Sequence, residues 1–584
     1  MEKRTLYAVI LSVIVITIGF TVQTILYPPE PAPLAPEVER PAPEAPRPED
    51  PAPDRPEPAP PAPVIAVGEI SAVPRDDISR QTRVYQNDLI RVSFSPQGAA
   101  VSSFQLLQHL DRGEPVEMVK TGAPGQLGFT MRFGGIDSPV IDDLFVYRRS
   151  DNPHVVEFYR DFYIGGREDT PFRVVRRYVF HPDEYMFELQ TVFENSVNEF
   201  IPVDIDGLAY TIATGPQIGP EFESLDGRQE FRRYLTYADG RRRNVSMSTG
   251  AREELIDRVN WAAISGKYFT LIAVPGAADY RLAFSAEPVQ GLQETSRIYV
   301  SRPVIRSSRS TDTLRYYAGP KTPEHLARYN SASDNAFRTQ NLNLDEALET
   351  RFLLGWLENI LKFALNSISR VVPNYGIAII ILTLIVKALL WPLTHKSHES
   401  TARMQTLSPK IQELREKYKD NPQKMNAETA ALYKKEGINP LGGCLPMLLQ
   451  FPFFIAMFGL FNNHFELRGA GFIPGWIDDL SAPESIWNFG DFTLPFLGWN
   501  DLRLLPIIFV GTQLLSSKFM QSPQAQGGQM KMMTYMLPLV FFFVLYNMPS
   551  GLLVYWIVTN ILTVGQQVYN SKFKQQKTAV SAKK

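Results

Sequence analysis

The last third of the chain is dominated by long apolar runs, which restrict its possible folds more than any other feature. A helix needs about 20 predominantly apolar residues to cross a hydrocarbon core about 30 Å thick. Runs of roughly this length predict membrane-spanning helices at residues 375–394, 441–461, 502–520, 532–547 and 551–569. The sequence therefore predicts a polytopic α-helical membrane protein with a core of five helices.

A sixth apolar run, at residues 6–27, lies behind the short basic start at residues 1–5. No small-residue cleavage pattern follows it, and it is longer than the apolar core of a typical signal peptide. We expect an uncleaved signal anchor, and a removed signal peptide is the less favoured alternative. The next segment, residues 28–63, has 16 prolines among its 36 residues. This composition predicts an extended spacer rather than a folded unit.

Two segments outside the spans show regular patterns of their own. Residues 76–325 contain short runs in which apolar and polar residues alternate, separated by Asn, Asp, Gly and Pro. Such runs are typical of strands, and their density predicts a large β-sandwich domain. In residues 344–370, large apolar side chains such as Phe352, Trp356 and Ile360 recur every four positions. We expect this segment to form an amphipathic helix that lies in the membrane surface.

Lysine and arginine are unevenly distributed among the loops. Residues 395–440, which are predicted to form a helical hairpin, carry nine of them, and the tail at 570–584 carries five. The loop at 462–501 carries only Arg468. Because positively charged loops remain on the cytoplasmic side of a membrane, we expect the hairpin, the loop at 521–531 and both termini in the cytoplasm. The β-sandwich is then outside.

Lys387 is the only charged side chain deep within one of the apolar runs. It lies about 11 residues past Gly376, which places it roughly 16 Å into the bilayer. A lone cation at that depth costs on the order of 3 kcal/mol or more. The other predicted spans contain no Asp or Glu to neutralise it. We expect Lys387 to face water or a transient acidic partner, and snorkelling toward an interface about 10 Å away is the alternative.

Polar residues of the spans are concentrated in the predicted cytoplasmic halves, whereas the outer halves are almost wholly apolar. Together with Lys387 they predict a hydrated concavity that is open to the cytoplasm and sealed outside. The candidates are Thr383, Gln450, Gln513, Ser517, Trp556, Asn560, Thr563 and Gln567. Each also has an ordinary structural explanation, since hydroxyl groups bond to their own helix backbone and glutamines join neighbouring helices. A hydrated concavity would lower the cost of bringing the polar flank of a polypeptide into the membrane.

Motifs for conventional catalysis are not evident. The glycine that a phosphate-binding loop requires before Ser517 is missing, and there is no HExxH pair. His395, His398 and Glu399 follow a span in an arrangement unsuited to zinc. The single cysteine, Cys444, forms no disulfide framework. We therefore expect no enzyme activity, no metal, no cofactor and no direct nucleic-acid function.

Several motifs in the last third carry a family resemblance. Residues 439–446 read Asn-Pro-Leu-Gly-Gly-Cys-Leu-Pro and precede Gln450, and a late Pro-Ser-Gly at 549–551 precedes Tyr555 and Trp556. Together with Lys387 and the predicted hairpin at 395–440, these motifs resemble those of the Oxa/Alb family of membrane protein insertases, in its Gram-negative form. The resemblance implies an insertase and folding chaperone of the bacterial inner membrane, with a periplasmic β-supersandwich domain. The resemblance also implies that such an insertase acts alone or with the Sec translocon and its accessory subunits.

The resemblance also assigns residues and partners by position. The family's groove cation falls on Lys387, its substrate-contacting threonine on Thr383 and an aromatic substrate contact on Trp556. Many members carry arginine where this chain has Lys387, which keeps the charge but loses the two-pronged donor geometry. The implied partners are nascent membrane proteins, the Sec translocon, membrane lipids and, through the basic hairpin and tail, ribosomes.

Two other classes of function stay open on the sequence alone. A secondary transporter also requires polar residues within the membrane, but it would usually show repeated halves and coupling carboxylates. In another alternative, the β-sandwich is a carbohydrate-binding module and the spans only anchor it. One crossing would be enough for such an anchor, and the inward bias of the polar residues would have no explanation.

Overall fold

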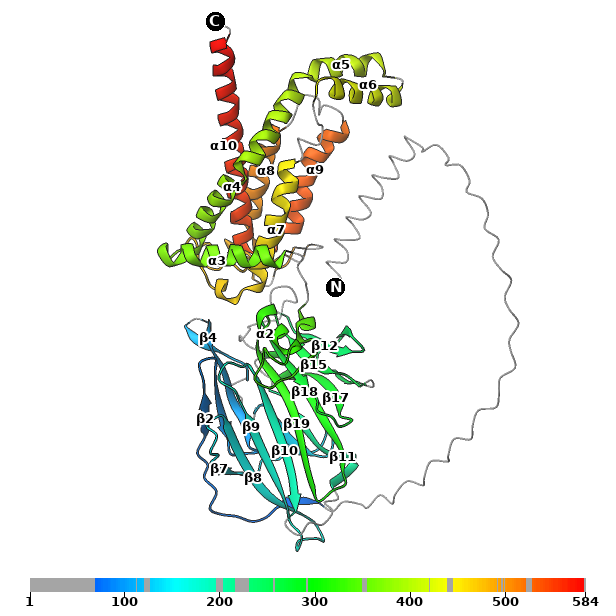
Figure 1. Ribbon diagram of the computed structural model, residues 1–584, viewed down its shortest axis with the longest axis vertical. Coiled ribbons are helices and arrows are strands. Elements are labelled where there is room, and N and C mark those ends of the chain that lie inside the picture. Colours follow the sequence, from blue (N-terminus) through cyan, green and yellow to red (C-terminus); the bar gives the residue numbers. More distant parts are fainter. Residues whose placement is uncertain are drawn as a thin grey trace, which may run out of the picture. The chain divides into compact units, whose positions relative to one another are not determined.

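The computed structural model describes residues 69–581 apart from short internal segments (Figure 1). The segments left out are residues 112, 120–126, 196–202, 216–230, 256–257, 290–291, 349–353, 420, 438–444, 491, 495–496, 498 and 521–527. The predicted anchor at 6–27, the proline-rich spacer at 28–63 and Cys444 lie outside the described residues.

The segment predicted to be a β-sandwich forms a ten-stranded antiparallel sheet with the order β1-β8-β9-β10-β19-β16-β15-β12-β13, and β7 pairs with β8 at one edge. The strands of this sheet are β1 (Ile70–Ala72), β7 (Val146–Arg148), β8 (Val155–Ile164), β9 (Phe172–Val179), β10 (Met186–Asn195), β12 (Arg233–Ala238), β13 (Arg241–Val245), β15 (Trp261–Ser265), β16 (Phe269–Val274) and β19 (Arg309–Pro320). Five of its nine strand pairs follow one another in the chain, whereas β1–β8, β10–β19, β16–β19 and β12–β15 join strands that do not.

Two smaller sheets complete this domain, with the orders β14-β17-β18-β11-β6 and β2-β3-β4-β5. Their strands are β2 (Arg83–Gln86), β3 (Ile90–Ser95), β4 (Ala100–Asp111), β5 (Glu114–Glu117), β6 (Thr130–Phe133), β11 (Val203–Ala213), β14 (Arg252–Leu255), β17 (Arg281–Val289) and β18 (Leu292–Ile305). A two-stranded ribbon lies elsewhere, between β20 (Trp487–Asn488) and β21 (Asp501–Leu502).

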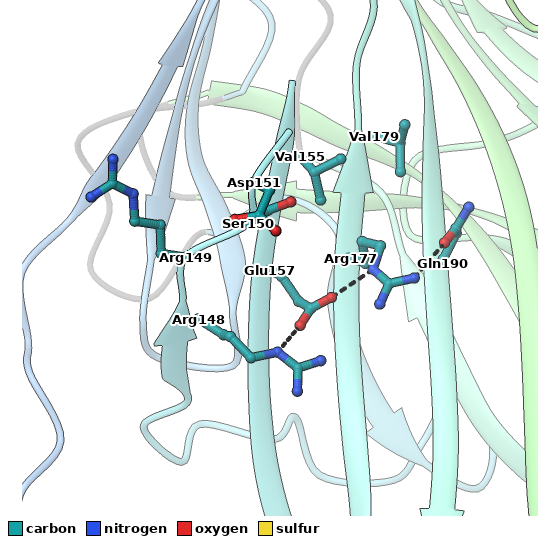
Figure 2. Close-up of a pocket in the computed structure, with 9 residues that line it drawn as sticks. All are labelled: Arg148, Arg149, Ser150, Asp151, Val155, Glu157, Arg177, Val179 and Gln190. Carbon is teal, nitrogen blue, oxygen red and sulfur yellow. Dashed lines mark hydrogen bonds and ion pairs between the residues drawn. The ribbon is translucent and has the colours of Figure 1, made fainter. Parts of the chain in front are cut away.

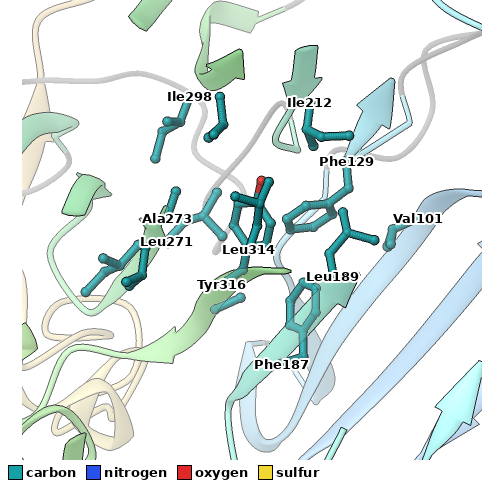
Figure 3. Close-up of a cluster of buried hydrophobic side chains, with 14 of the residues drawn as sticks. Val101, Phe129, Phe187, Leu189, Ile212, Leu271, Ala273, Ile298, Leu314 and Tyr316 are labelled. Atoms are coloured by element: carbon teal, nitrogen blue, oxygen red, sulfur yellow. The ribbon is translucent and has the colours of Figure 1, made fainter. Parts of the chain in front are cut away.

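The sheets pack face to face through side chains that alternate along each strand. In β10 and β19, Leu189 and Leu314 are cross-strand partners, and both are fully or almost fully buried. Figure 3 shows them with Ile212 of β11 and Ile298 of β18, which come from the opposing five-stranded sheet. Because side chains of a strand point alternately to its two faces, the apolar residues of the alternating sequences fill one core between the sheets. The predicted sandwich is thereby confirmed.

The rest of the chain is helical. Its helices are α2 (Pro323–Ala327), α3 (Gly355–Val371), α4 (Tyr375–Thr406), α5 (Ser408–Lys417), α6 (Pro422–Lys435), α7 (Leu445–Asn463), α8 (Leu505–Met520), α9 (Gly528–Leu545) and α10 (Ser550–Ser581). Short 3-10 turns are η1 (Arg328–Asn330), η2 (Leu344–Ala347) and η4 (Phe465–Leu467). In Figure 1, α4, α7, α8, α9 and α10 lie side by side as a bundle, with the α5–α6 hairpin at one end and α3 across the other.

Two of the described helices are long and apolar enough to cross a membrane by length and composition, at Tyr375–Pro392 in α4 and Ser550–Tyr569 in α10. A shorter apolar stretch, Leu505–Ser517, lies in α8. The predicted spans at 441–461 and 532–547 overlap α7 and α9. All five predicted core spans therefore coincide with helices of the bundle.

Some boundaries differ from the sequence-based expectation. The interfacial helix was expected from residue 344, but α3 begins at Gly355. Leu344 and Ala347 instead form a 3-10 turn, and both are buried in the core of the β-sandwich. Their apolar spacing therefore reflects packing against that domain. At its far end, α4 continues through Pro392 to Thr406, well past the predicted end of the span.

Candidate functional site

Lys387 lies at the centre of a polar contact between three helices. From α4, its Nζ donates a hydrogen bond to Thr563 Oγ1 of α10 at 2.9 Å and a longer one to Gln450 Oε1 of α7 at 3.4 Å. Both partners are uncharged, and within the described ranges no ion pair involves Lys387. No acidic side chain among the described residues therefore neutralises the ammonium group.

A second polar contact continues from the first along α10. Asn560 is one helical turn from Thr563, and its Nδ2 donates to Gln513 Oε1 of α8 at 2.9 Å and to Thr512 Oγ1 at 3.3 Å. Residues three apart on a helix lie on the same face. The two contacts therefore form one polar string that links α4, α7, α8 and α10, and it contains four of the predicted site residues besides Lys387.

The other predicted residues lie near this string with different surroundings. Thr383 is buried on α4, one turn before Lys387, and its hydroxyl donates to the Ile379 carbonyl of its own helix at 2.6 Å. Ser517 is half-buried on α8, one turn after Gln513. On α10, the side-chain oxygen of Gln567 is buried and has no hydrogen-bond partner among the described residues.

Gln566 is a polar contact that the sequence reasoning missed. Its Nε2 donates to Thr394 Oγ1 of α4 at 3.2 Å, and both residues are buried. The signal was present, because Gln566 follows Thr563 by three positions and Thr394 follows Lys387 by seven, spacings that return to one face of a helix. The interface between α4 and α10 therefore contains two polar contacts, one at Lys387 and one nearer the α5–α6 hairpin at Thr394.

An aromatic cluster lies next to the polar string. The ring of Trp556 packs against Phe454 of α7, Phe509 of α8 and Phe541 of α9, with centroid distances of 4.4, 4.8 and 5.5 Å. Trp556 is one helical turn before Asn560, on the side of the α10 N-terminus. The cluster therefore separates the polar string from the end of the bundle that carries α3.

That end of the bundle is covered by the connection between α7 and α8, residues 464–504, which we call the cap. Its backbone and side chains bind the end of one helix after another. Phe472 O accepts from Asn374 Nδ2 before α4, and Glu484 Oε1 accepts from the first amide of α8, at Leu505. Ser550 at the start of α10 donates to the carbonyls of Asp479 and Ala482.

The amphipathic helix α3 is held to the same end by polar side chains. Glu358, which is only 7% exposed, accepts from His464 Nε2 at 3.0 Å, and Lys362 pairs with Glu466 at 3.2 Å. Burial raises the pKa of Glu466, but the Lys362 ammonium overcomes this and holds the pKa below its usual value. The α3 face opposite these contacts is apolar and exposed, with Trp356 at 64% and Phe363 at 76%.

A separate hollow of about 470 Å³ lies on the β-sandwich, over β8, β9 and β10. Figure 2 shows the buried Glu157 between Arg148 and Arg177, both of which bind its carboxylate through Nε. Arg177 also donates to Gln190 at 3.3 Å. The carboxylate of Glu157 is therefore neutralised by its own neighbours, in a cross-strand ladder that stabilises the sheet.

Two family models match the chain, and together they cover most of it. One, described as the YidC periplasmic domain, matches residues 84–363. The other, described as the 60Kd inner membrane protein, matches residues 367–578. The division between them, at residues 363–367, falls within α3, so the first model covers the sandwich and the second covers the helices of the bundle.

Similar proteins span the same length. The membrane protein insertase YidC of Treponema denticola is 38% identical, over 98% of this chain and 99% of the relative. That of Treponema pallidum is 36% identical, over 86% of this chain and 87% of the relative. A crystal structure of an active YidC insertase is similar over 87% of this chain and 96% of that one, at 16% identity and a TM-score of 0.33. The chain belongs to the YidC family of membrane protein insertases.

Proposed function

We propose that this protein inserts integral membrane proteins into the bacterial inner membrane and helps them fold, with the polar string around Lys387 as the receiving site. The observation that carries the proposal is the contact of one cation with neutral groups from two other helices, at mid-depth in an apolar bundle. A permanent structural cation would be expected to have an acidic partner. Neutral partners are more easily displaced by an acidic group of a substrate than a bound carboxylate would be.

The physical steps follow from this arrangement. An acidic flank of a nascent chain replaces Thr563 or Gln450 at Lys387, and opposite charges about 4 Å apart attract by about 4 kcal/mol at an effective dielectric constant of about 20. This attraction offsets part of the cost of bringing the flank into the membrane. Burial of the apolar helix of the substrate, at roughly 25 cal/mol per Å², then drives it into lipid. Lys387 thus serves as a transient receptor and not as a chemical catalyst.

The topology belongs to the proposal. The sandwich is periplasmic, as the name of the matching family model states, and α3 and the cap follow it on that side. The α5–α6 hairpin and both termini are then cytoplasmic, in agreement with the distribution of lysine and arginine. Further partners are the Sec translocon and ribosomes, the latter through the basic hairpin and tail.

A secondary transporter is not favoured, because full-length relatives are named insertases. The polar string also lacks the coupling carboxylate that such a transporter usually has, within the described ranges. The hypothesis that the spans merely anchor the sandwich leaves a four-helix polar string without a purpose.

The direct test is insertion into liposomes that contain the purified protein. The substrate is a short single-span protein whose translocated tail carries none, one or several acidic residues. We expect Lys387→Ala to reduce insertion of the acidic substrates by about tenfold or more, as the loss of a few kcal/mol predicts. Lys387→Arg keeps the charge and should retain most of the activity.

The matched control is Lys410→Ala, which removes a lysine from the exposed ion pair with Glu436 in the α5–α6 hairpin. It should insert all substrates as the unaltered protein does. Equal activity of Lys387→Ala, Lys387→Arg and the unaltered protein would show that Lys387 is not the receptor.

A further inference from the structure

The cap carries a small hairpin whose aromatic side chains are exposed. It is built on the pairing of β20 with β21, and further backbone bonds join Ile486 to Leu502 and Phe489 to Asn500. Trp487 is 66% exposed and Phe492 is 61% exposed, although both are large and apolar. Soluble surfaces rarely present such residues together, so this patch predicts a partner.

Several polar side chains of the hairpin form hydrogen bonds with one another. Asp501 Oδ1 accepts from Ser485 Oγ and Asn488 Nδ2, each at 2.8 Å. On the same side, Arg503 Nη2 binds the other oxygen of Asp501, and its Nη1 donates to the Tyr546 carbonyl at the end of α9. Asp501 thus binds polar groups on one side of the ribbon, whereas the rings of Trp487 and Phe492 are exposed.

Trp499 fixes the position of the hairpin against α9. Its ring stacks on Tyr546 with centroids 3.6 Å apart and planes 8° apart, and it also stacks on Phe543 at 5.8 Å. Phe543 is 47% exposed and belongs to the outward face of α9, with Leu539 and Val544. In a bundle within a bilayer, such an outward apolar face contacts acyl chains. The exposed rings of the hairpin therefore continue a lipid-facing surface.

We propose that the hairpin built on β20 and β21 is a membrane anchor in addition to α3, and that it inserts Trp487 and Phe492 into the headgroup region of the outer leaflet. Trp and other amphipathic aromatic side chains favour this region. The partner is the lipid surface itself. Helix α3 contacts α4 and α7, whereas the hairpin contacts α9. The two elements would thus anchor different sides of the bundle. This requires only that the bundle crosses a bilayer, not that it inserts other proteins.

The test uses the full-length protein with Cys444→Ser, which removes the only cysteine. Trp487→Cys and Phe492→Cys are each labelled with an environment-sensitive fluorophore and reconstituted in phosphatidylcholine–phosphatidylglycerol vesicles. Lipids that carry a nitroxide near the headgroup should quench both labels about threefold more strongly than lipids that carry it near the chain end, as expected at the interface.

Two further positions calibrate the measurement. Phe363→Cys on the exposed face of α3 should give the same depth profile as the hairpin labels. Val84→Cys on β2, which is 59% exposed on the sandwich, should be quenched by aqueous iodide and not by the nitroxide lipids. If the hairpin labels behave like the one at residue 84, or are shielded from both quenchers, the lipid anchor is refuted. Shielding from both would indicate a protein partner.

Discussion

At the scale of single residues, the polar string shows how a membrane bundle holds a charge without neutralising it. Lys387 is bound by a hydroxyl and an amide oxygen, and Asn560 binds a glutamine and a threonine on the next helix. Each contact joins helices that lipid alone would not hold together, because acyl chains are as apolar as leucine. The same side chains therefore position the site and stabilise the bundle.

The contact between Asn560 and Gln513 is expected to contribute modestly to stability. Asn560→Ala and Gln513→Ala should each destabilise the protein, because each leaves one polar partner without its hydrogen bond. The double variant should show a coupling of about 0.6 kcal/mol, the average for hydrogen bonds within membrane proteins. The measurement is a double-mutant cycle of unfolding in detergent.

The control for this cycle pairs Asn560→Ala with Ser367→Ala. Ser367 lies on α3, and among the described residues its hydroxyl bonds only to the Phe363 carbonyl of its own helix, at 2.7 Å. The effects of these two substitutions should simply add. A coupling between Asn560 and Gln513 that is no larger than in the control pair would show that their bond does not stabilise the bundle.

At the scale of elements, the periodic patterns predicted the structure best where one face of an element is buried. The alternation in 76–325 gave the strands of the sandwich, and the apolar runs coincide with the helices of the bundle. The start of α3 was misplaced because Leu344 and Ala347 are buried against the sandwich rather than on a helix. Spacing along the sequence does not say which neighbour buries a side chain.

For the candidate site, the sequence predicted how deep each residue lies along its helix but not which neighbour it contacts. Depth along a span follows from counting residues, so Lys387, Gln450, Asn560 and Thr563 were placed at compatible levels. The rotation of each helix does not follow from counting, and the bond between Gln566 and Thr394 was therefore missed. The role of each residue toward a substrate stays a prediction.

The close packing of α10 against α7 predicts that a larger residue at Gly551 destabilises the bundle. A methyl group at Gly551, near the start of α10, would overlap the ring of Phe461, which is fully buried at the end of α7. Gly551→Ala should therefore destabilise the bundle by about 1–3 kcal/mol, the usual cost of overpacking. The midpoint of thermal unfolding in detergent measures this.

Gly565→Ala is the matched control on the same helix, because open space surrounds the position. Alanine is the better helix former, so this variant should be unchanged or stabilised by up to about 1 kcal/mol. Should Gly551→Ala prove as stable as Gly565→Ala, the ends of α7 and α10 would not be closely packed.

At the scale of the whole molecule, the sandwich and the bundle have separate cores. One cluster of buried side chains fills the space between the sheets, and another joins α3, α4, α7, α8 and α10. The hydrogen bonds of the polar string all lie within residues 387–563. None of the hydrogen bonds of the proposed receiving site therefore involves the sandwich.

Deletion of residues 81–320, most of the sandwich, should accordingly leave insertion largely intact. The assay is the same liposome insertion of a single-span substrate, with the amount of folded, reconstituted protein matched between the two forms. A loss as large as that of Lys387→Ala would mean that the sandwich takes part in the insertion step itself.

The cap has a mechanical consequence. It binds the start of α4, α8 and α10 and, through Trp499 and Arg503, the end of α9, so these helices share a fixed pivot at one extremity. Toward the opposite end, α4 and α10 contact each other through Thr394 and Gln566, but no described connecting segment binds several helix ends there. If the bundle widens, we expect the helices to move apart least beside the cap and most at the opposite end. We would therefore expect a polypeptide that inserts between these helices to enter from the end opposite the cap.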